Sequence, residues 1–314
     1  RYCHYAATSS GKNEFKKEGK IMFIIIGFVI IFGGVAVGFA MAAGGYGPMN
    51  FGAIGGLFHL NEFISLGGMV IGSCVVMAPV PVLKGVFKQA LGTLKGSPYD
   101  QNDYEELFKC MYELFQLGRK GGMIALEEHV MNPEASALFS NYPKFHGNHH
   151  ALEYLADGLK PIVDGRIKPD QLEPLMAKSL HKMEEEHHEP VLVMTKVADS
   201  LPAFGIVAAV LGIIVVMMFK IGGDTAVVGQ GIATALAGTF FGIFGSYCMV
   251  GPLATNCEFN GHAELTYMKV IKSSVISFAN GLPPLVACEV GRRELGEDVR
   301  MSSGDLETLL KSGG

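Results

Sequence analysis

Long runs without a charged residue dominate the hydrophobic pattern of the chain. Asp, Glu, Lys and Arg are absent from Ile21 to Asn61, from Phe63 to Leu83, from Ser200 to Phe219 and from Thr225 to Cys257. Because about 20 apolar residues are needed to cross the hydrocarbon core of a bilayer, each run can hold one membrane-spanning helix. The pattern predicts such helices at 22–43, 64–84, 201–221 and 227–250, with a glycine-rich turn through Gly44, Gly45, Gly47 and Pro48 after the first.

The segment between the second and third runs has a helical period instead. Six apolar residues, spaced three or four apart, form one stripe: Tyr104, Leu107, Phe108, Met111, Leu114 and Phe115. This stripe predicts an amphipathic helix. Further helices are predicted after Asn132-Pro133, over 149–163, and from about 171 into the third membrane segment.

The last 55 residues continue the helical pattern. A helix is predicted over 259–279, and Pro283-Pro284 ends it. Residues 285–295 favour one more helix, and 300–314 are expected to be a loose end. Because no strand-like alternation occurs, the predicted fold class is an all-α integral membrane protein. It has four transmembrane helices, a large helical cytoplasmic domain between the second and third, and a helical cytoplasmic tail.

Composition supports a membrane protein. Hydrophobic residues make up 49% of the 314 residues and charged residues only 18%, against about 25% charged in soluble domains. The net charge of −5 gives no general attraction to nucleic acid. We therefore expect a lipid membrane, and no nucleic acid, among the partners.

The distribution of Lys and Arg predicts the orientation. These residues are concentrated in 84–199 and in the tail, and the connection between the first two spans has none. By the positive-inside rule, both termini and the long loop lie in the cytoplasm. The expected domains are 1–21, an N-terminal extension or a mis-called start before Met22, then 22–86 with the first two spans, 87–199 as the cytoplasmic domain, 200–253 with the last two spans, and 254–314 as the cytoplasmic tail.

The chain carries no sequence signature of an enzyme. GxSxG, phosphate-loop and dinucleotide-binding patterns are absent from the sequence, so neither catalysis nor a cofactor is expected. Histidines cluster at His146, His149 and His150, and a second group of Glu and His occupies 184–189. Imidazole and carboxylate groups suit divalent metals, but a solvated helix face explains the second group equally well, and no metal site is predicted.

The predicted spans contain few polar residues. None has Asp, Glu, Lys, Arg or His at its centre, and ion paths in membranes normally need an ionisable group. We therefore expect a partner to bring the carboxylate if the chain conducts ions. Thr234 and Thr239 either line a narrow path or bond back to carbonyls of their own helix.

Prolines and glycines mark the edges and faces of the spans. Pro202 is expected to open the third span and Pro252 to close the fourth, as punctuation or as hinges. Gly238-x-x-x-Gly242 and Gly34-x-x-x-Gly38 permit close approach of helices, either within one chain or between copies.

Several motifs resemble a known family. Asp199 to Val210 (DSLPAFGIVAAV), followed by Gly212, resembles the third membrane helix of the MotA family of flagellar stator proteins. Gly238 to Ile243 and Gly251 to Ala254 resemble its fourth. The resemblance extends to the cytoplasmic segment at Arg119, Glu127-Glu128, Asn132-Pro133 and Tyr142-Pro143, and to the tail at Pro283-Pro284 and Glu289-x-Gly291-Arg292. It covers about residues 22–295.

The resemblance implies an ion-conducting stator subunit in the bacterial inner membrane. Five copies would surround two copies of a single-span MotB-type partner, which brings the membrane aspartate, and contacts with the rotor protein FliG would transmit torque. Pro202 and Pro252 match residues that couple ion flow to motion, and Thr239 matches a hydroxyl beside the ion path. Arg119 and Glu127, with Glu128 as an alternative to Glu127, match the rotor-facing charges.

The resemblance also bears on the ion. Sodium-type relatives carry Thr where this chain has Ala209, and a methyl group offers no oxygen ligand to Na⁺, so protons are expected. Two alternatives remain open. One is an energiser of the ExbB/TolQ type, which has three spans. The other is a membrane scaffold with a histidine-rich, metal-sensing loop.

Overall fold

The computed structural model describes residues 3–44, 58, 60–93, 99–219 and 222–312, and these residues form helices and turns without a strand. The chain divides into two compact units. The first comprises residues 1–96 and 187–259, and the second comprises 97–186 and 260–314. The glycine-rich turn predicted after the first span lies largely outside the described residues.

Four helical segments are long and apolar enough to cross a membrane. They are Ile24–Gly44 within α1 (Cys3–Gly44), α2 (Leu60–Met77), the span within α9 (Pro169–Phe219), and the one within the continuous helical stretch Thr225–Ala279. This confirms four candidate spans. The last two residues predicted for the third span, 220–221, lie outside the described residues.

The second span is displaced from its prediction. It begins at Leu60 rather than 64 and ends at Met77 rather than 84. Pro79 causes the early end, because proline disfavours helical backbone in the residue before it. The chain then turns into α3 (Val80–Thr93). In this helix Gln89 donates a hydrogen bond to the carbonyl of His187 at 3.1 Å, and Val86 and Ala90 pack against buried Val191 and Met194 of α9.

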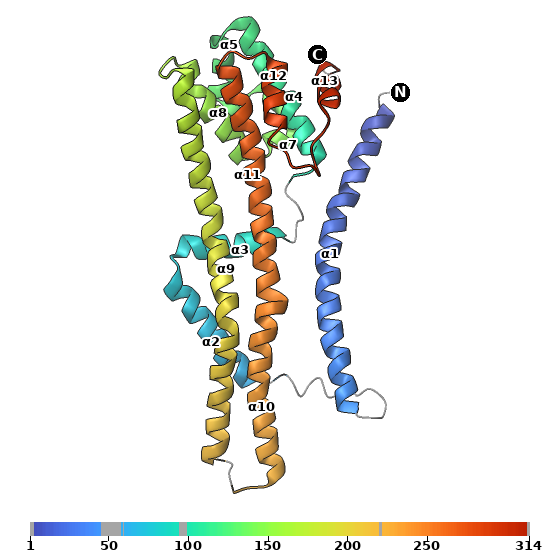
Figure 1. Ribbon diagram of the computed structural model, residues 1–314, viewed down its shortest axis with the longest axis vertical. Helices are drawn as coiled ribbons and strands as arrows, with labels where there is room; N and C mark the ends of the chain where they lie inside the picture. Colours follow the sequence, from blue (N-terminus) through green and yellow to red (C-terminus); the bar gives the residue numbers. More distant parts are fainter. Residues whose placement is uncertain (1–2, 45–57, 59, 94–98, 220–221, 313–314) are drawn as a thin grey trace. The chain divides into compact units, whose positions relative to one another are not determined.

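The third and fourth spans are parts of longer helices (Figure 1). Pro202 does not open a helix as expected. It lies inside α9, which runs unbroken from Pro169 to Phe219 because the apolar pattern of the segment before the membrane leads into that of the span. Pro252 does not close one either. The α10 helix (Thr225–Phe244) passes through a π-helical turn, η3 (Gly245–Val250), directly into α11 (Gly251–Ala279).

The second unit is a helical domain with its own core. Its first helix, α4 (Gln101–Gly121), buries the predicted apolar stripe, and Asp100 caps it with a reciprocal capping box. The helix predicted after Asn132-Pro133 is not one helix but three short turns, since Ser136 and Pro143 each start a new one. After α4, the unit continues with α5 (Ile124–Met131), the three short turns η2 (Pro133–Ala135), α6 (Ala137–Ser140) and α7 (Pro143–His146), and then α8 (His149–Val163).

Residues 303–311 form a helix, contrary to the expectation of a loose end over 300–314. Following the predicted break at Pro283-Pro284, α12 (Pro284–Arg292) and α13 (Ser303–Lys311) form. Ser302 caps α13, and Leu306 and Leu310 are buried in the core of the second unit. The leucines four residues apart give this short segment an apolar face, and burial of that face stabilises the helix.

Candidate functional site

Glycines bring α9 and α10 into backbone contact in the first unit. A methyl group on Gly242 would lie 2.6 Å from the carbonyl oxygen of Leu201 and 2.8 Å from Cα of Gly205. One on Gly205 would lie 2.8 Å from the carbonyl oxygen of Gly238. Among the described residues, by contrast, no atom of another element lies within 4 Å of such a methyl group on Gly34 or Gly38. The glycine pair of α10 therefore serves packing within one chain, and the pair of α1 faces open space.

The two threonines differ in their hydrogen bonds. Thr234 donates to the carbonyl of Gln230 at 2.9 Å, four residues back in the same helix. Thr239 instead reaches the carbonyl of Gly205 on α9, at a long 3.5 Å. The back-bonding expected of a membrane threonine thus holds for Thr234. Thr239 links the two helices at the level of their closest approach.

Ala209 and Pro202 lie on α9 in different surroundings. Ala209 is 6% exposed in the single chain, whereas its neighbours Ile206, Val210 and Leu211 are about half exposed. Pro202 is partly buried and removes one backbone donor from the helix. The carbonyl of Ala198, one turn earlier, therefore lacks its usual helical partner.

The π-helical turn stands directly before Pro252. The backbone N–H of Gly251 bonds to the carbonyl of Ser246, five residues back, in place of the usual four. The Pro252 side chain is exposed in the single chain. The helical ladder is thus loosened at two consecutive places, by the wide turn and by the missing proline donor.

The membrane-spanning part contains a carboxylate that the sequence did not place there. Glu62 lies in the first turn of α2 and is only 7% exposed. Its Oε2 would lie 2.6 Å from a methyl group on Gly238, and its Oε1 3.5 Å from one on Gly212. The sequence analysis expects no ionisable residue at the centre of a span, and Glu62 is in the first turn of its own helix, yet it packs beside Gly212 of α9 and Gly238 of α10. Glu62 separates two charge-free runs in the sequence, which is a signal for a span boundary, and only packing shows which part of α9 and α10 it meets.

The predicted rotor-facing charges lie at a helical corner of the second unit. Arg119 is in the last turn of α4, and Glu127 and Glu128 follow in α5. All three are exposed, and no ion pair between described residues involves them. Gly118 permits the corner, because a methyl group there would lie 2.9 Å from both Leu126 and Phe278, and Gly122 has the positive φ of 75° that suits glycine.

Two histidines of the first cluster are held by hydrogen bonds. His146 Nε2 lies 2.9 Å from the backbone oxygen of Glu134, and His149 Nδ1 lies 3.0 Å from its carboxylate. On α9, Lys182 pairs with Glu185 and Glu186 along one exposed face. No group of three or more His, Cys, Asp or Glu residues in the described ranges is arranged to hold a metal ion.

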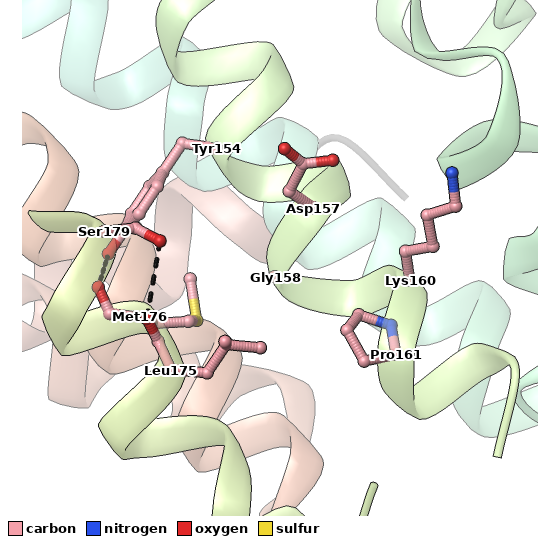
Figure 2. A pocket seen from close by; sticks show the side chains of 8 residues that line it. All are labelled: Tyr154, Asp157, Gly158, Lys160, Pro161, Leu175, Met176 and Ser179. Atoms are coloured by element: carbon pink, nitrogen blue, oxygen red, sulfur yellow. Dashed lines mark hydrogen bonds between the residues drawn. The ribbon is translucent and has the colours of Figure 1, made fainter. Parts of the chain in front are cut away.

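A groove of about 310 Å³ lies between α8 and α9 in the second unit, and its lining includes none of the predicted site residues (Figure 2). The Tyr154 hydroxyl donates to the carbonyl of Met176 at 3.0 Å across it. Gly158 makes room for the Met176 side chain, whose Cε would lie 2.6 Å from a methyl group at that position. Asp157 and Lys160 are exposed at its rim. The groove marks the packing of two helices and brings no reactive groups together.

Two family profiles match the chain. Motility protein A N-terminal matches residues 25–122, and the MotA/TolQ/ExbB proton channel family matches residues 147–269. The chain is 32% identical to Motility protein A of Salmonella typhimurium over 93% of its own length and 96% of the relative. It is 30% identical to Chemotaxis protein LafT of Vibrio parahaemolyticus over 93% and 98%.

The fold also matches solved structures. A chain of C. jejuni MotAB superposes with a TM-score of 0.69 at 22% identity and covers 88% of this chain and 97% of the other. A chain of the flagellar MotAB stator complex from Bacillus subtilis superposes with a TM-score of 0.66 at 22% identity and covers 90% and 97%. The chain is therefore a channel component and not an enzyme. The profiles and the near full-length relatives together show that it belongs to the motility protein A family, within the MotA/TolQ/ExbB proton channels.

Proposed function

We propose that the chain is an ion-conducting stator subunit of the bacterial flagellar motor and works with a single-span MotB-type partner. The two solved structures named above are of MotAB complexes, and the two relatives named above are motility and chemotaxis proteins. The observation that carries the proposal is the exposure of large apolar side chains on α1, α9 and α10 in the single chain. Such side chains are suited to contact with lipid, with further copies of the chain and with a partner helix.

The assembly has five copies around two copies of the partner in the bacterial inner membrane. Both termini and the second unit lie in the cytoplasm, since Lys and Arg are concentrated outside the connection between the first two spans. Gly34 and Gly38, open in the single chain, are available for contacts between copies. The partner brings the membrane aspartate whose protonation drives the motor.

The ion path follows the α9–α10 pair. Thr239, Thr234 and Ala209 border it, and Pro202 and Pro252 couple the passage of the ion to movement of the helices. Ala209 offers a methyl group where a dehydrated sodium ion would need an oxygen ligand, which favours protons. Pro202 interrupts the hydrogen-bond ladder of a helix that continues into the second unit, so a change beside the path reaches that unit through one helix.

The rotor-facing surface is the α4–α5 corner. Arg119 and the Glu127-Glu128 pair are exposed and free of ion pairs with other described residues, so their charges are available to FliG. Contact of opposite charges at this corner transmits torque and is weakened by salt.

The experiment that tests the proposal measures cytoplasmic pH in cells that express the chain with a MotB-type partner whose periplasmic plug is deleted. Acidification is expected with the pair. It should be absent with the chain alone and with a partner whose membrane aspartate is changed to alanine. No acidification with both proteins present in the membrane would overturn proton conduction, and a sodium indicator would then identify a sodium path.

A further inference from the structure

Glu62 occupies the middle of the α9–α10 pair, although it begins its own helix. Gly238 lies about 20 Å along α10 from its first residue, and Gly212 lies about 10 Å before the end of α9, at 1.5 Å per residue. Both oxygens of the Glu62 carboxyl face these two glycines. The carboxyl is therefore at the depth of the central contact between the two spans and not at their ends.

The surroundings of the carboxyl are small and apolar on these helices. Ala208 and Ala235 are buried beside Gly238 and Gly212, and a methyl group on Gly238 would also lie 3.2 Å from Cβ of Ala208. No other acidic or basic residue occurs in α2, in 208–216 of α9 or in 231–242 of α10. Burying an ionised carboxylate at such a place is costly, so an acidic residue within a span marks a functional site by default.

The position connects Glu62 to the proposed ion path. Gly238 directly precedes Thr239, whose hydroxyl links α10 to α9, and Gly205 receives that hydrogen bond. The glycines at 212 and 238 leave the space that the carboxyl fills, because a side chain at 238 would collide with Oε2. The carboxyl thus packs against Gly238, the residue directly before Thr239, which is predicted to border the ion path.

We propose that Glu62 is a proton-binding residue of this chain and a second proton-exchanging carboxyl on the ion path beside that of the partner. This inference rests on the proposed stator function. The carboxylate takes up one proton and becomes a neutral carboxylic acid, which suits the apolar faces of α9 and α10 beside it. It returns to carboxylate when it gives that proton to the ionised membrane aspartate of the partner. No other atoms or electrons are exchanged.

Two substitutions separate proton binding from packing. Glu62→Gln keeps the size of the side chain and cannot ionise, whereas Glu62→Asp is shorter and can. In the acidification assay with the plug-deleted partner, Glu62→Gln should lower proton flux by at least about 10-fold, and Glu62→Asp should retain most of it. Both should still co-purify with the partner. Glu173→Gln, an exposed carboxyl of α9, is the matched control and should conduct like the unmodified chain.

The opposite pattern would overturn the proposal. If Glu62→Gln conducts like the unmodified chain, or if Glu62→Asp is the weaker of the two, the carboxyl fills space and carries no proton. If the unmodified pair itself does not conduct, the proposed stator function fails, and the following measurement alone decides the role of Glu62.

The second measurement needs no substitution. A hydrophobic carbodiimide labels protonated carboxyls in apolar surroundings, and mass spectrometry of the purified complex locates the label. Glu62 should be labelled, and the labelling rate should fall as the pH rises, because the group exchanges its proton with water. No labelling at any pH, or labelling at one rate across the pH range, would show a carboxyl that does not exchange and would overturn the proposal.

Discussion

At the scale of single residues, Pro202 is informative because the helix continues through it. A proline inside a helix costs about 3 kcal/mol or more, through the lost hydrogen bond and the clash with the preceding turn. In α9 this proline stands where the apolar stretch begins. We therefore interpret Pro202 as a residue that weakens the helix locally so that it can move, and this interpretation can be tested.

Pro202→Ala restores the backbone donor for the carbonyl of Ala198. The purified complex should melt at a higher temperature, with α9 stabilised by up to about 3 kcal/mol. Cells carrying the variant should nevertheless lose most of their swimming speed while the complex still assembles. Pro174→Ala, another proline within α9 but in the second unit, is the control and should swim normally. Normal swimming of the Pro202 variant would contradict a coupling role.

A second residue-scale prediction concerns the tail. Glu289 forms a bidentate pair with Arg292, with both contacts at 2.7 Å, and Arg292 also donates to the carbonyl of Met301 at 2.8 Å. The hydrogen bonds and the charge of Arg292 lower the pKa of the Glu289 carboxyl. A lowered pKa means that the pair stabilises the fold above the range where free glutamate titrates, about 4.3, and that this contribution is lost as the pH falls through the lowered value.

Glu289→Gln should therefore destabilise the tail at neutral pH by about 1–2 kcal/mol. Limited proteolysis of the loop between α12 and α13 in the full complex would report this as faster cleavage. The difference from the unmodified chain should shrink as the pH falls through the lowered pKa of Glu289, because the native carboxyl then becomes protonated as well. Glu297→Gln, exposed in the same loop, serves as control. A difference that stays constant with pH would exclude the ion pair as its cause.

At the scale of the elements, the glycines of α10 have unequal roles that the sequence alone does not separate. Gly242 faces backbone atoms of α9 at distances that leave no space for a methyl group. A methyl group on Gly229, on the same helix, would have no described atom of another element within 4 Å. Gly242→Ala should cost about 1–3 kcal/mol or more, because backbone atoms cannot rotate away. Gly229→Ala should be neutral or stabilising by up to about 1 kcal/mol.

Fluorescence-detected size exclusion of the detergent-solubilised complex would measure this difference as the yield of assembled protein. The Gly242 variant should give little assembled complex, and the Gly229 variant should match the unmodified chain. Equal yields from both variants would contradict the close packing of α9 on α10.

The elements also show what the sequence can predict. Charge-free runs and the apolar stripe located the spans, α4 and α8, because burial imposes a strong periodicity on long segments. Prolines were misleading, since Pro202 and Pro252 lie within continuous helices. The short α13 was missed because its stability comes from burying Leu306 and Leu310 against distant residues. The burial of Glu62 could not be predicted from the sequence. A residue at the start of one helix can still pack beside the middle of neighbouring helices, and only the structure shows that it does.

At the scale of the whole molecule, the exposed corner at Arg119 predicts an electrostatic partner. Arg119→Glu should abolish most torque in tethered cells while proton flux persists, because the corner is remote in sequence from the spans. A charge reversal on FliG should restore part of the torque. Lys178→Glu, exposed on α9, is the control and should have little effect. Failure of every compensating change on FliG would argue against contact between these charges.

The π-helical turn has a consequence for the length of the chain. A π turn holds one more residue than an α turn, and each residue of an α-helix advances by about 100°. Gly245–Val250 therefore absorbs what amounts to an inserted residue and leaves Gly251 and everything after it in a different rotational phase from α10. A chain with one residue deleted from 245–250 would keep a continuous helix through this place. Pro252 and the residues after it would then be rotated by about 100° and would face different neighbours.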